Sequence, residues 1–416
     1  MSYSEPKLLR GTAGSSPTGA VGRLLGLDAM RAIAVMGMVY MHVSPTGWLN
    51  ALPFAEKAAP LAWFEGIITG RAMSLFVLMA GVSVALMTGG STPHTGARLR
   101  TARQCIAIRA AVLFLVSLGV DQFSGMNLSI LEFYSIWLLL LIPLLRLSPR
   151  TLITSAAIAG IVLPIFCFIV MNYGRDWPIS PFSGSPQAAF GLPLLWQPLG
   201  WLAKTKQLLI GGGFQTPYAI PLLLAGLAVG RLDLRSPAVL RSLAITGALL
   251  VAGGWLLSQL ALGPLGAEQA LADMMSSSGP LLQPWISVLT LPPHQLYAMS
   301  IPMAPFMLGI GLLLLSLLLT LLQRRSWRSA LLPLTATGRM ALTWYAAHHI
   351  FIQRVAGDPP YAFTLFAGMI VFALIASPLW LSWQTRGPLE WLMYRASLLA
   401  VPARKNAATQ RPVHRP

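Results

Sequence analysis

Three ionisable residues lie in one apolar run near the start of the chain, at spacings that could support chemistry. The run reads GLDAMRAIAVMGMVYMHVSP, with Asp28 and Arg31 at its entrance and His42 eleven residues past Arg31. In a helix, at about 1.5 Å per residue, this spacing places the imidazole about 16 Å deeper than the guanidinium. Ionisable groups inside a membrane span are costly and therefore indicate function. The alternative is that Arg31 and His42 only anchor the two ends of a span.

A second polar group lies in a late apolar run, which reads GRMALTWYAAHHIFIQ. Arg339 lies at its start, and His348 and His349 follow nine and ten residues later, at a depth similar to that of His42. Consecutive helical residues point about 100° apart, so at most one of these two histidines should face the bundle centre. Histidine is a proton acceptor near neutral pH. Because there is no HxxxH spacing and no nearby cysteine or carboxylate cluster, we expect no bound metal.

Arginines gather just before several apolar runs, including a cluster of four at 98–109. Guanidinium groups bind phosphates well, so these side chains could hold a phosphorylated donor. The alternative is that they only set the topology and contact anionic lipid. Arg109 and Arg339 lie nearest the hydrocarbon and are harder to explain in that way. The predicted donor-binding residues are therefore Arg103, Arg109 and Arg339, together with Arg71 at the entrance of the second run.

The composition identifies the environment of these residues. Of 416 residues, 55% are hydrophobic and 10% are charged, whereas soluble proteins carry about 25% charged residues. We therefore expect an all-α, multi-pass integral membrane protein with a tail at 1–22, a single transmembrane domain at 23–398 and a basic tail at 399–416. Ten runs approach the ~20 residues that a spanning helix needs. These runs are 31–49, 72–88, 105–120, 128–146, 152–173, 215–230, 239–261, 298–322, 333–353 and 361–383.

The net charge of +17 is carried by short basic clusters between the apolar runs. This placement follows the positive-inside rule and argues against nucleic acid as a partner. With both termini cytoplasmic, 23 of the 29 Lys and Arg residues fall on the cytoplasmic side. A segment around Trp201, Lys204 and Lys206 is predicted to lie in the membrane interface. We expect a multi-pass protein of the cell (inner or plasma) membrane, in contact with lipid. Whether it forms a homodimer is left open by the sequence.

Five segments of the chain resemble a known family. The first span of the transmembrane acyltransferase superfamily is similar to GLDAMRAIAVMGMVYMH, and its YeiB-like branch is similar to FEGIITGRAMSLFVLMAGVSVAL, PLLLAGLAVGRLDL, TGRMALTWYAAHHIFIQ and RGPLEWLMYRASL. These segments run in the expected order from about residue 23 to 398. Heparan-α-glucosaminide N-acetyltransferase is a relative of this branch with the same architecture. The chain departs from the branch at His42, where Asn is usual, and at Trp344 and His348, where Asn and Gln are common.

The resemblance implies a membrane acyltransferase that moves an acyl group, in the first instance acetyl, from cytoplasmic acyl-CoA to a hydroxyl or amine of a sugar, lipid or small molecule. We expect His42 to act as general base, Asp28 and Arg31 to orient the helix entrance or hold the donor, and His348 to be a second acid/base or a substrate ligand. Two other classes stay open. One is a transporter or exporter of a small polar or lipid-like molecule, and the other is a non-catalytic membrane partner or sensor. The acceptor is unknown.

Overall fold

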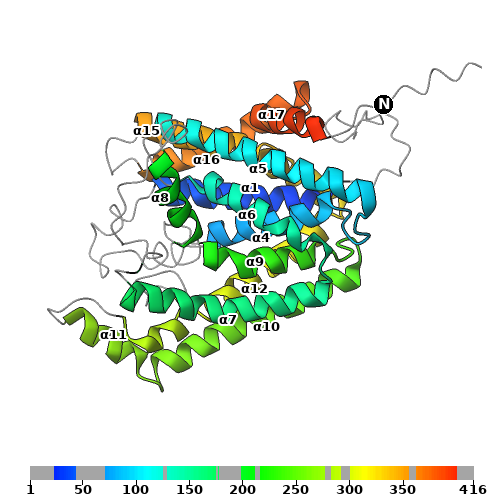
Figure 1. Cartoon of the computed structure of the whole chain (residues 1–416). Coiled ribbons are helices and arrows are strands. Elements are labelled where there is room, and N and C mark those ends of the chain that lie inside the picture. The colour runs from blue at the N-terminus through cyan, green and yellow to red at the C-terminus, as the bar shows by residue number, and fades with distance from the viewer. Residues whose placement is uncertain are drawn as a thin grey trace, which may run out of the picture.

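The computed structural model describes residues 23–43, 71–124, 129–174, 177, 198–210, 216–276, 283–291, 300–355 and 362–400. Every regular element in these ranges is a helix, and Figure 1 shows the long helices lying side by side in one bundle. The α-helices are α1 (Leu25–Val43), α4 (Arg71–Met87), α5 (Gly96–Ser124), α6 (Ile130–Leu141), α7 (Pro149–Tyr173), α8 (Pro198–Leu209), α9 (Thr216–Val229), α10 (Pro237–Leu262), α11 (Ala267–Ser276), α12 (Met303–Leu321), α13 (Arg325–Ala330), α14 (Leu332–Arg339), α15 (Ala341–Val355), α16 (Ala362–Trp383) and α17 (Pro388–Ser397). Short 3₁₀ turns are η2 (Pro143–Arg146), η4 (Trp285–Leu289) and η6 (Leu398–Ala400).

Helices dominate because a backbone in hydrocarbon has no water to bond and must pair its polar groups within the segment. By length and composition, five described helices could cross a membrane: α5, α7, α10, α12 and α16. Three shorter apolar helices, α4, α6 and α9, accompany them. Each of the ten predicted runs overlaps at least one described helix. The protein is therefore an all-α membrane protein, as predicted, whereas the predicted tails lie outside the described residues except for 399–400.

The ten-span topology stays a prediction, and reporter fusions test it. We expect cytoplasmic signals from fusions after Arg103, Arg150, Arg241 and Arg328, because basic loops are retained on the cytoplasmic side. Fusions within 50–70, 174–214 and 262–297 should report the opposite side. Two adjacent loops that report the same side would remove or add a crossing and refute this topology.

Helix α1 lies at the centre of the bundle, in contact with α4, α12, α14, α15 and α16. Its small and flexible residues allow this close packing, and Ala29, Met30 and Ala34 are completely buried. On α14, Gly338 lies against the backbone carbonyl of Asp28, where there is no room for a Cβ. This contact brings the charged entrance of α1 to the end of α14.

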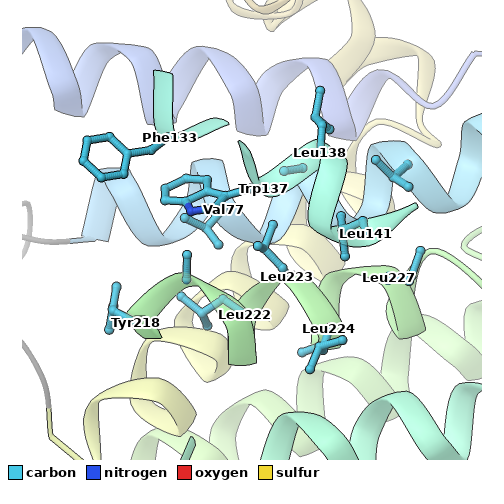
Figure 2. Close-up of a cluster of buried hydrophobic side chains, with 14 of the residues drawn as sticks. Val77, Phe133, Trp137, Leu138, Leu141, Tyr218, Leu222, Leu223, Leu224 and Leu227 are labelled. Atoms are coloured by element: carbon cyan, nitrogen blue, oxygen red, sulfur yellow. The ribbon is translucent and has the colours of Figure 1, made fainter. Parts of the chain in front are cut away.

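A second packed region joins α4, α6 and α9. Figure 2 shows Phe133 and Trp137 of α6 above Leu222 and Leu223 of α9, and all four side chains are buried. The Trp137 indole Nε1 donates a hydrogen bond of 3.0 Å to the hydroxyl of Thr216, so the ring is buried without an unpaired donor. This core fixes the helices on one side of the site described below.

The ninth predicted run, 333–353, is not one continuous helix, which corrects the sequence-based prediction. It is divided into α14 and α15 at Met340, whose backbone angles (φ −112°, ψ 24°) leave the α-helical region. The carboxylate of Glu390 on α17 accepts hydrogen bonds from the backbone N–H groups of Leu342 (2.7 Å) and Thr343 (3.1 Å). Because the first N–H groups of a helix have no partner within it, a carboxylate held there favours a helix start at this point.

The interfacial position of helix α8 stays a prediction, but Lys204 is not the exposed anchor that this prediction assumed. Lys204 is 1% exposed and forms an ion pair with Glu132 of α6, which is 2% exposed. Asp121 of α5 is buried as well. Lys204 is buried because Glu132 supplies its charge partner inside the protein. It therefore does not need the lipid headgroups that an interfacial lysine would contact.

Candidate active site

The entrance of α1 is organised by one buried carboxylate. Asp28 is 2% exposed and accepts hydrogen bonds from Arg23 (3.0 Å to Nη2) and from Arg31 (2.9 Å to Nη1). A second nitrogen of Arg31 donates to the hydroxyl of Ser83 on α4 at 2.9 Å. Asp28 and Arg31 therefore form the pair that their spacing of three predicts, and Asp28 holds two guanidinium groups in place.

A cavity of about 410 Å³ opens beside this entrance. Five arginines from different parts of the chain line it, and the rest of the lining is mostly apolar and aromatic, with Ser83, Thr385 and Glu390 as further polar residues. The arginines are Arg23, Arg31, Arg109, Arg339 and Arg386, and the aromatic residues are Phe76, Tyr134, Tyr345 and Tyr394. Such a lining suits a ligand that has an anionic group and a less polar arm, because guanidinium groups bind phosphates through several hydrogen bonds.

Protein contacts hold two of the predicted donor-binding arginines, Arg109 and Arg339. Arg109 Nε donates to the hydroxyl of Ser397 at 3.1 Å, and Nη1 contacts the sulfur of Met87 at 3.4 Å. Arg339 Nη2 donates to the backbone carbonyl of Thr385 at 3.0 Å. A guanidinium has five N–H donors, so within the described residues these bonds leave donors of both arginines for a ligand.

The histidines of α1 and α15 meet near the other end of α1. His42 Nδ1 lies 2.9 Å from His348 Nε2, and the two rings are stacked with their centroids 5.1 Å apart. The ring of His349 lies 4.6 Å from that of His42 and 4.4 Å from that of His348. The expectation that at most one histidine of the pair faces the bundle centre is therefore wrong. The rings of His348 and His349 both lie against the ring of His42.

The hydrogen bonds define the tautomers of a neutral histidine pair. His348 Nδ1 lies 3.1 Å from the backbone carbonyl of Trp344. A carbonyl only accepts, so Nδ1 of His348 carries the proton and its Nε2 has a lone pair. Nδ1 of His42 then donates to that Nε2, which leaves Nε2 of His42 as the proton acceptor. His348 thus holds His42 in the tautomer that a general base requires.

Tyr345 connects the cavity to the histidines. Its ring lines the inner part of the cavity and lies 5.2 Å from the ring of His348 and 4.7 Å from that of His349. Its hydroxyl accepts a hydrogen bond of 3.0 Å from the backbone N–H of Ile130. Of the described residues that line the cavity, none is a histidine, and Tyr345 is a lining residue whose ring contacts both His348 and His349.

The structure brings most of the predicted site residues into these two parts. Arg31, Arg109 and Arg339 line the cavity, and Asp28 pairs with Arg31 beside it. His42 and His348 form the histidine pair. Two predicted donor-binding residues, Arg103 and Arg71, are not part of the lining.

Arg71 lies at the start of α4, with its guanidinium carbon 5.8 Å from the ring centre of Phe306 on α12. It therefore lies at the end of α4 away from Ser83, the residue that bonds Arg31. Arg103 lies on α5 six positions before Arg109, which is nearly two helical turns. Distance along the helix, and not residue type, separates these two arginines from the cavity.

Sequence reasoning missed Arg23, Arg386, Tyr345 and Glu390 as parts of the site. The available signal was the RGPLEWL segment, which contains Arg386 and Glu390 and follows the last span. Burial raises the pKa of Glu390, although the hydrogen bonds from Thr343 and Leu342 act in the opposite direction. The segment therefore supplies both a cavity residue and the carboxylate at the start of α15.

We expect Glu390→Ala to lower the melting temperature of the purified protein, because it leaves the N–H groups of Leu342 and Thr343 without their partner. The free energy of unfolding should fall by about 1–3 kcal/mol, the usual penalty for unsatisfied buried donors. Glu268→Ala on α11 is the matched control, since Glu268 is exposed. Equal melting temperatures for the two variants would refute a stabilising role for the Glu390 contacts.

Two regions of the chain that contribute residues to this site match known families. Residues 23–177 match the family model of the heparan-α-glucosaminide N-acetyltransferase catalytic region. Residues 268–400 match a family described as a protein of unknown function, DUF418. No curated protein matches the chain. The first match contains His42, Arg31 and Arg109, and the second contains Arg339 and His348.

The fold and the matched regions define the class, a multi-pass membrane protein related to membrane acetyltransferases. The two matches together support the resemblance to the acyltransferase-related YeiB-like family, and neither of them covers half of the chain.

Proposed function

We propose that this protein is a membrane acyltransferase that transfers an acyl group, in the first instance acetyl, from acyl-CoA to a hydroxyl or amine of a sugar, lipid or small-molecule acceptor. The observation that carries the proposal is the proximity of two features. An arginine-lined cavity and a tautomer-fixed histidine pair both contact Tyr345. The match to an acetyltransferase catalytic region over 23–177 supports the same reaction class.

The donor is proposed to bind with its phosphates at Arg31, Arg109 and Arg339 and its pantetheine arm toward Tyr345. By the positive-inside pattern, this end of the bundle faces the cytoplasm, where acyl-CoA is available, and the protein resides in the cell membrane. The arginines lower the free energy of the bound phosphates through charge-assisted hydrogen bonds. The apolar lining suits the arm between the phosphates and the thioester.

The proposed chemistry takes place at Nε2 of His42. This nitrogen accepts the proton of the acceptor hydroxyl or amine while the acceptor oxygen or nitrogen attacks the thioester carbonyl carbon. The carbon–sulfur bond then breaks, and the proton passes to the thiolate, so the products are the acylated acceptor and free CoA. His348 positions the His42 ring and stabilises the imidazolium that forms in between, because its Nε2 accepts from Nδ1 of His42.

Because Tyr345 lines the cavity and its ring contacts the histidines, the proposal includes a movement of this ring that lets the acyl group reach His42. We expect Tyr345→Trp to slow transfer by about tenfold or more, which corresponds to about 1.4 kcal/mol on the barrier. Acyl-CoA binding, measured by isothermal titration, should change much less, because the arginines are unaltered. Transfer at the wild-type rate in this variant would show that the acyl group does not pass Tyr345.

The direct test uses purified full-length protein in detergent or nanodiscs with acetyl-CoA and a panel of sugar, lipid and amine acceptors. We expect release of the CoA thiol that depends on an acceptor, together with an acetylated product detected by mass spectrometry. If acetyl-CoA neither binds nor is consumed with any acceptor, while the protein remains folded, the acyltransferase proposal fails.

A transporter or exporter is the second candidate, and the break between α14 and α15 favours it. Helices interrupted near a binding site are common in secondary transporters, where the free helix ends bind substrate. Here, however, Glu390 already occupies the N–H groups at the start of α15. Flux of a labelled substrate across proteoliposomes, without any acetylated product, would favour this candidate over the transferase.

A further inference from the structure

The three histidines of the site form a compact set of nitrogen ligands. One ring nitrogen from each of His42, His348 and His349 can be chosen so that all three lie within 4.8 Å of one another. His348 and His349 are 2% and 0% exposed, and His42 is partly buried. A tetrahedral zinc ion with Zn–N bonds of about 2.0–2.1 Å needs ligand nitrogens about 3.3 Å apart. The three ring nitrogens are therefore close to the separation that zinc needs, and rotation of the rings could bring them to it.

His349 is the residue that the transferase proposal does not use. Among the described residues, neither of its ring nitrogens has a hydrogen-bond partner. Its ring is fully buried and lies against His42, His348 and Tyr345. Buried polar nitrogens are normally paired, so an unpaired imidazole in contact with two others indicates a ligand that all three share.

The surroundings select the kind of ion. The set consists of three imidazoles, and no carboxylate or thiolate of the described residues belongs to it. Imidazole ligands suit zinc, copper, nickel and similar ions, whereas magnesium and calcium prefer oxygen. The bond from His348 Nδ1 to the Trp344 carbonyl directs Nε2 of His348 into the set. Histidine ligands of metals usually have such an outer hydrogen bond, which fixes the tautomer.

In contrast to the expectation from the sequence that no metal is bound, we propose that His42, His348 and His349 bind one divalent ion of the zinc class, with a fourth position open to water or another small ligand. Metal binding and proton acceptance need the same lone pairs, because the His42–His348 hydrogen bond must break for His348 Nε2 to become a ligand. If the proposed acyl transfer takes place, the bound ion inhibits it. This consequence rests on the proposed function, whereas metal binding itself does not.

The experiment measures binding of Co²⁺ and Zn²⁺ to metal-stripped, purified full-length protein. We expect one Co²⁺ per chain with the intense visible absorption of a tetrahedral site, and Zn²⁺ should displace it. His349→Ala should weaken Co²⁺ binding by about tenfold to a hundredfold or more, since even an outer-shell change has an effect of that size. His94→Ala, a histidine outside the set, is the matched control and should bind like wild type.

A second variant and a second measurement keep the result interpretable. If His349→Ala aggregates on size exclusion, His42→Gln replaces it, because His42 is the least buried of the three. Absence of stoichiometric Co²⁺ binding to the folded wild type, or unchanged binding in the folded variants, overturns the metal site. The ratio of transferase activity with and without Zn²⁺, taken for the wild type, His349→Ala and His94→Ala, tests inhibition. Metal binding by a protein that shows no transferase activity even in its metal-stripped form would refute the proposed function but support the site.

Discussion

Replacing His42 by alanine is expected to abolish detectable acyl transfer while the protein still inserts and folds. General-base catalysis contributes about 10²–10⁴-fold to a rate, and the loss should lie in this range. The only described hydrogen bond of the His42 side chain is to His348, so few stabilising contacts are lost. The measurement is kcat for acetyl transfer in purified protein, with melting temperature as the folding check. His94→Ala is the control for a histidine change elsewhere.

The replacement His42→Asn is a sharper version of the same test, because it introduces the residue that is usual in the YeiB-like branch. We expect it to be inactive as a transferase, since an amide cannot accept a proton near neutral pH. His348→Ala should be slow as well, and adding it to His42→Ala should cause little further loss, because the two residues act as a unit. Full activity of His42→Asn would exclude His42 as the base.

The second large effect is expected at the donor-binding arginines. Arg109→Gln and Arg339→Gln should each weaken acyl-CoA binding, because each removes charge-assisted contacts with phosphate. Such a contact is worth about 1.5–3 kcal/mol, or about a tenfold to a hundredfold change in Kd. Isothermal titration or competition with labelled acyl-CoA measures the change. Higher salt should weaken wild-type binding more than binding to the variants, because salt screens partly exposed charges.

Arg103→Gln is the matched control for this prediction. It removes the same charge from the same helix, α5, but Arg103 does not line the cavity. We therefore expect its acyl-CoA affinity to stay close to wild type. If Arg103→Gln and Arg109→Gln weaken binding equally, net charge and not the cavity controls the affinity. If none of the three changes matters, the arginines serve topology alone.

The all-α fold and the membrane environment follow from the sequence, because they depend on local quantities. Long apolar runs must be helical in hydrocarbon, whatever their neighbours are. The pairing of Asp28 with Arg31 is equally local, since a spacing of three places both on one helix face. His42 stands out in the sequence because a histidine within an apolar run is unusual by composition alone. The arginines near the hydrocarbon, Arg109 and Arg339, were found by the same reasoning.

The tertiary structure alone decided which of these residues share a site. His42 and His348 are 306 positions apart, and they meet because α1 packs against α15. After the break at Met340, the N–H of Leu342 donates to Glu390, which lies on another helix 48 positions further along the chain. Arg71, Arg103 and Arg109 are alike as residues, and only their positions along packed helices separate the one that lines the cavity. Such contacts arise from side-chain packing between distant segments, and no local pattern of hydrophobicity or charge encodes them.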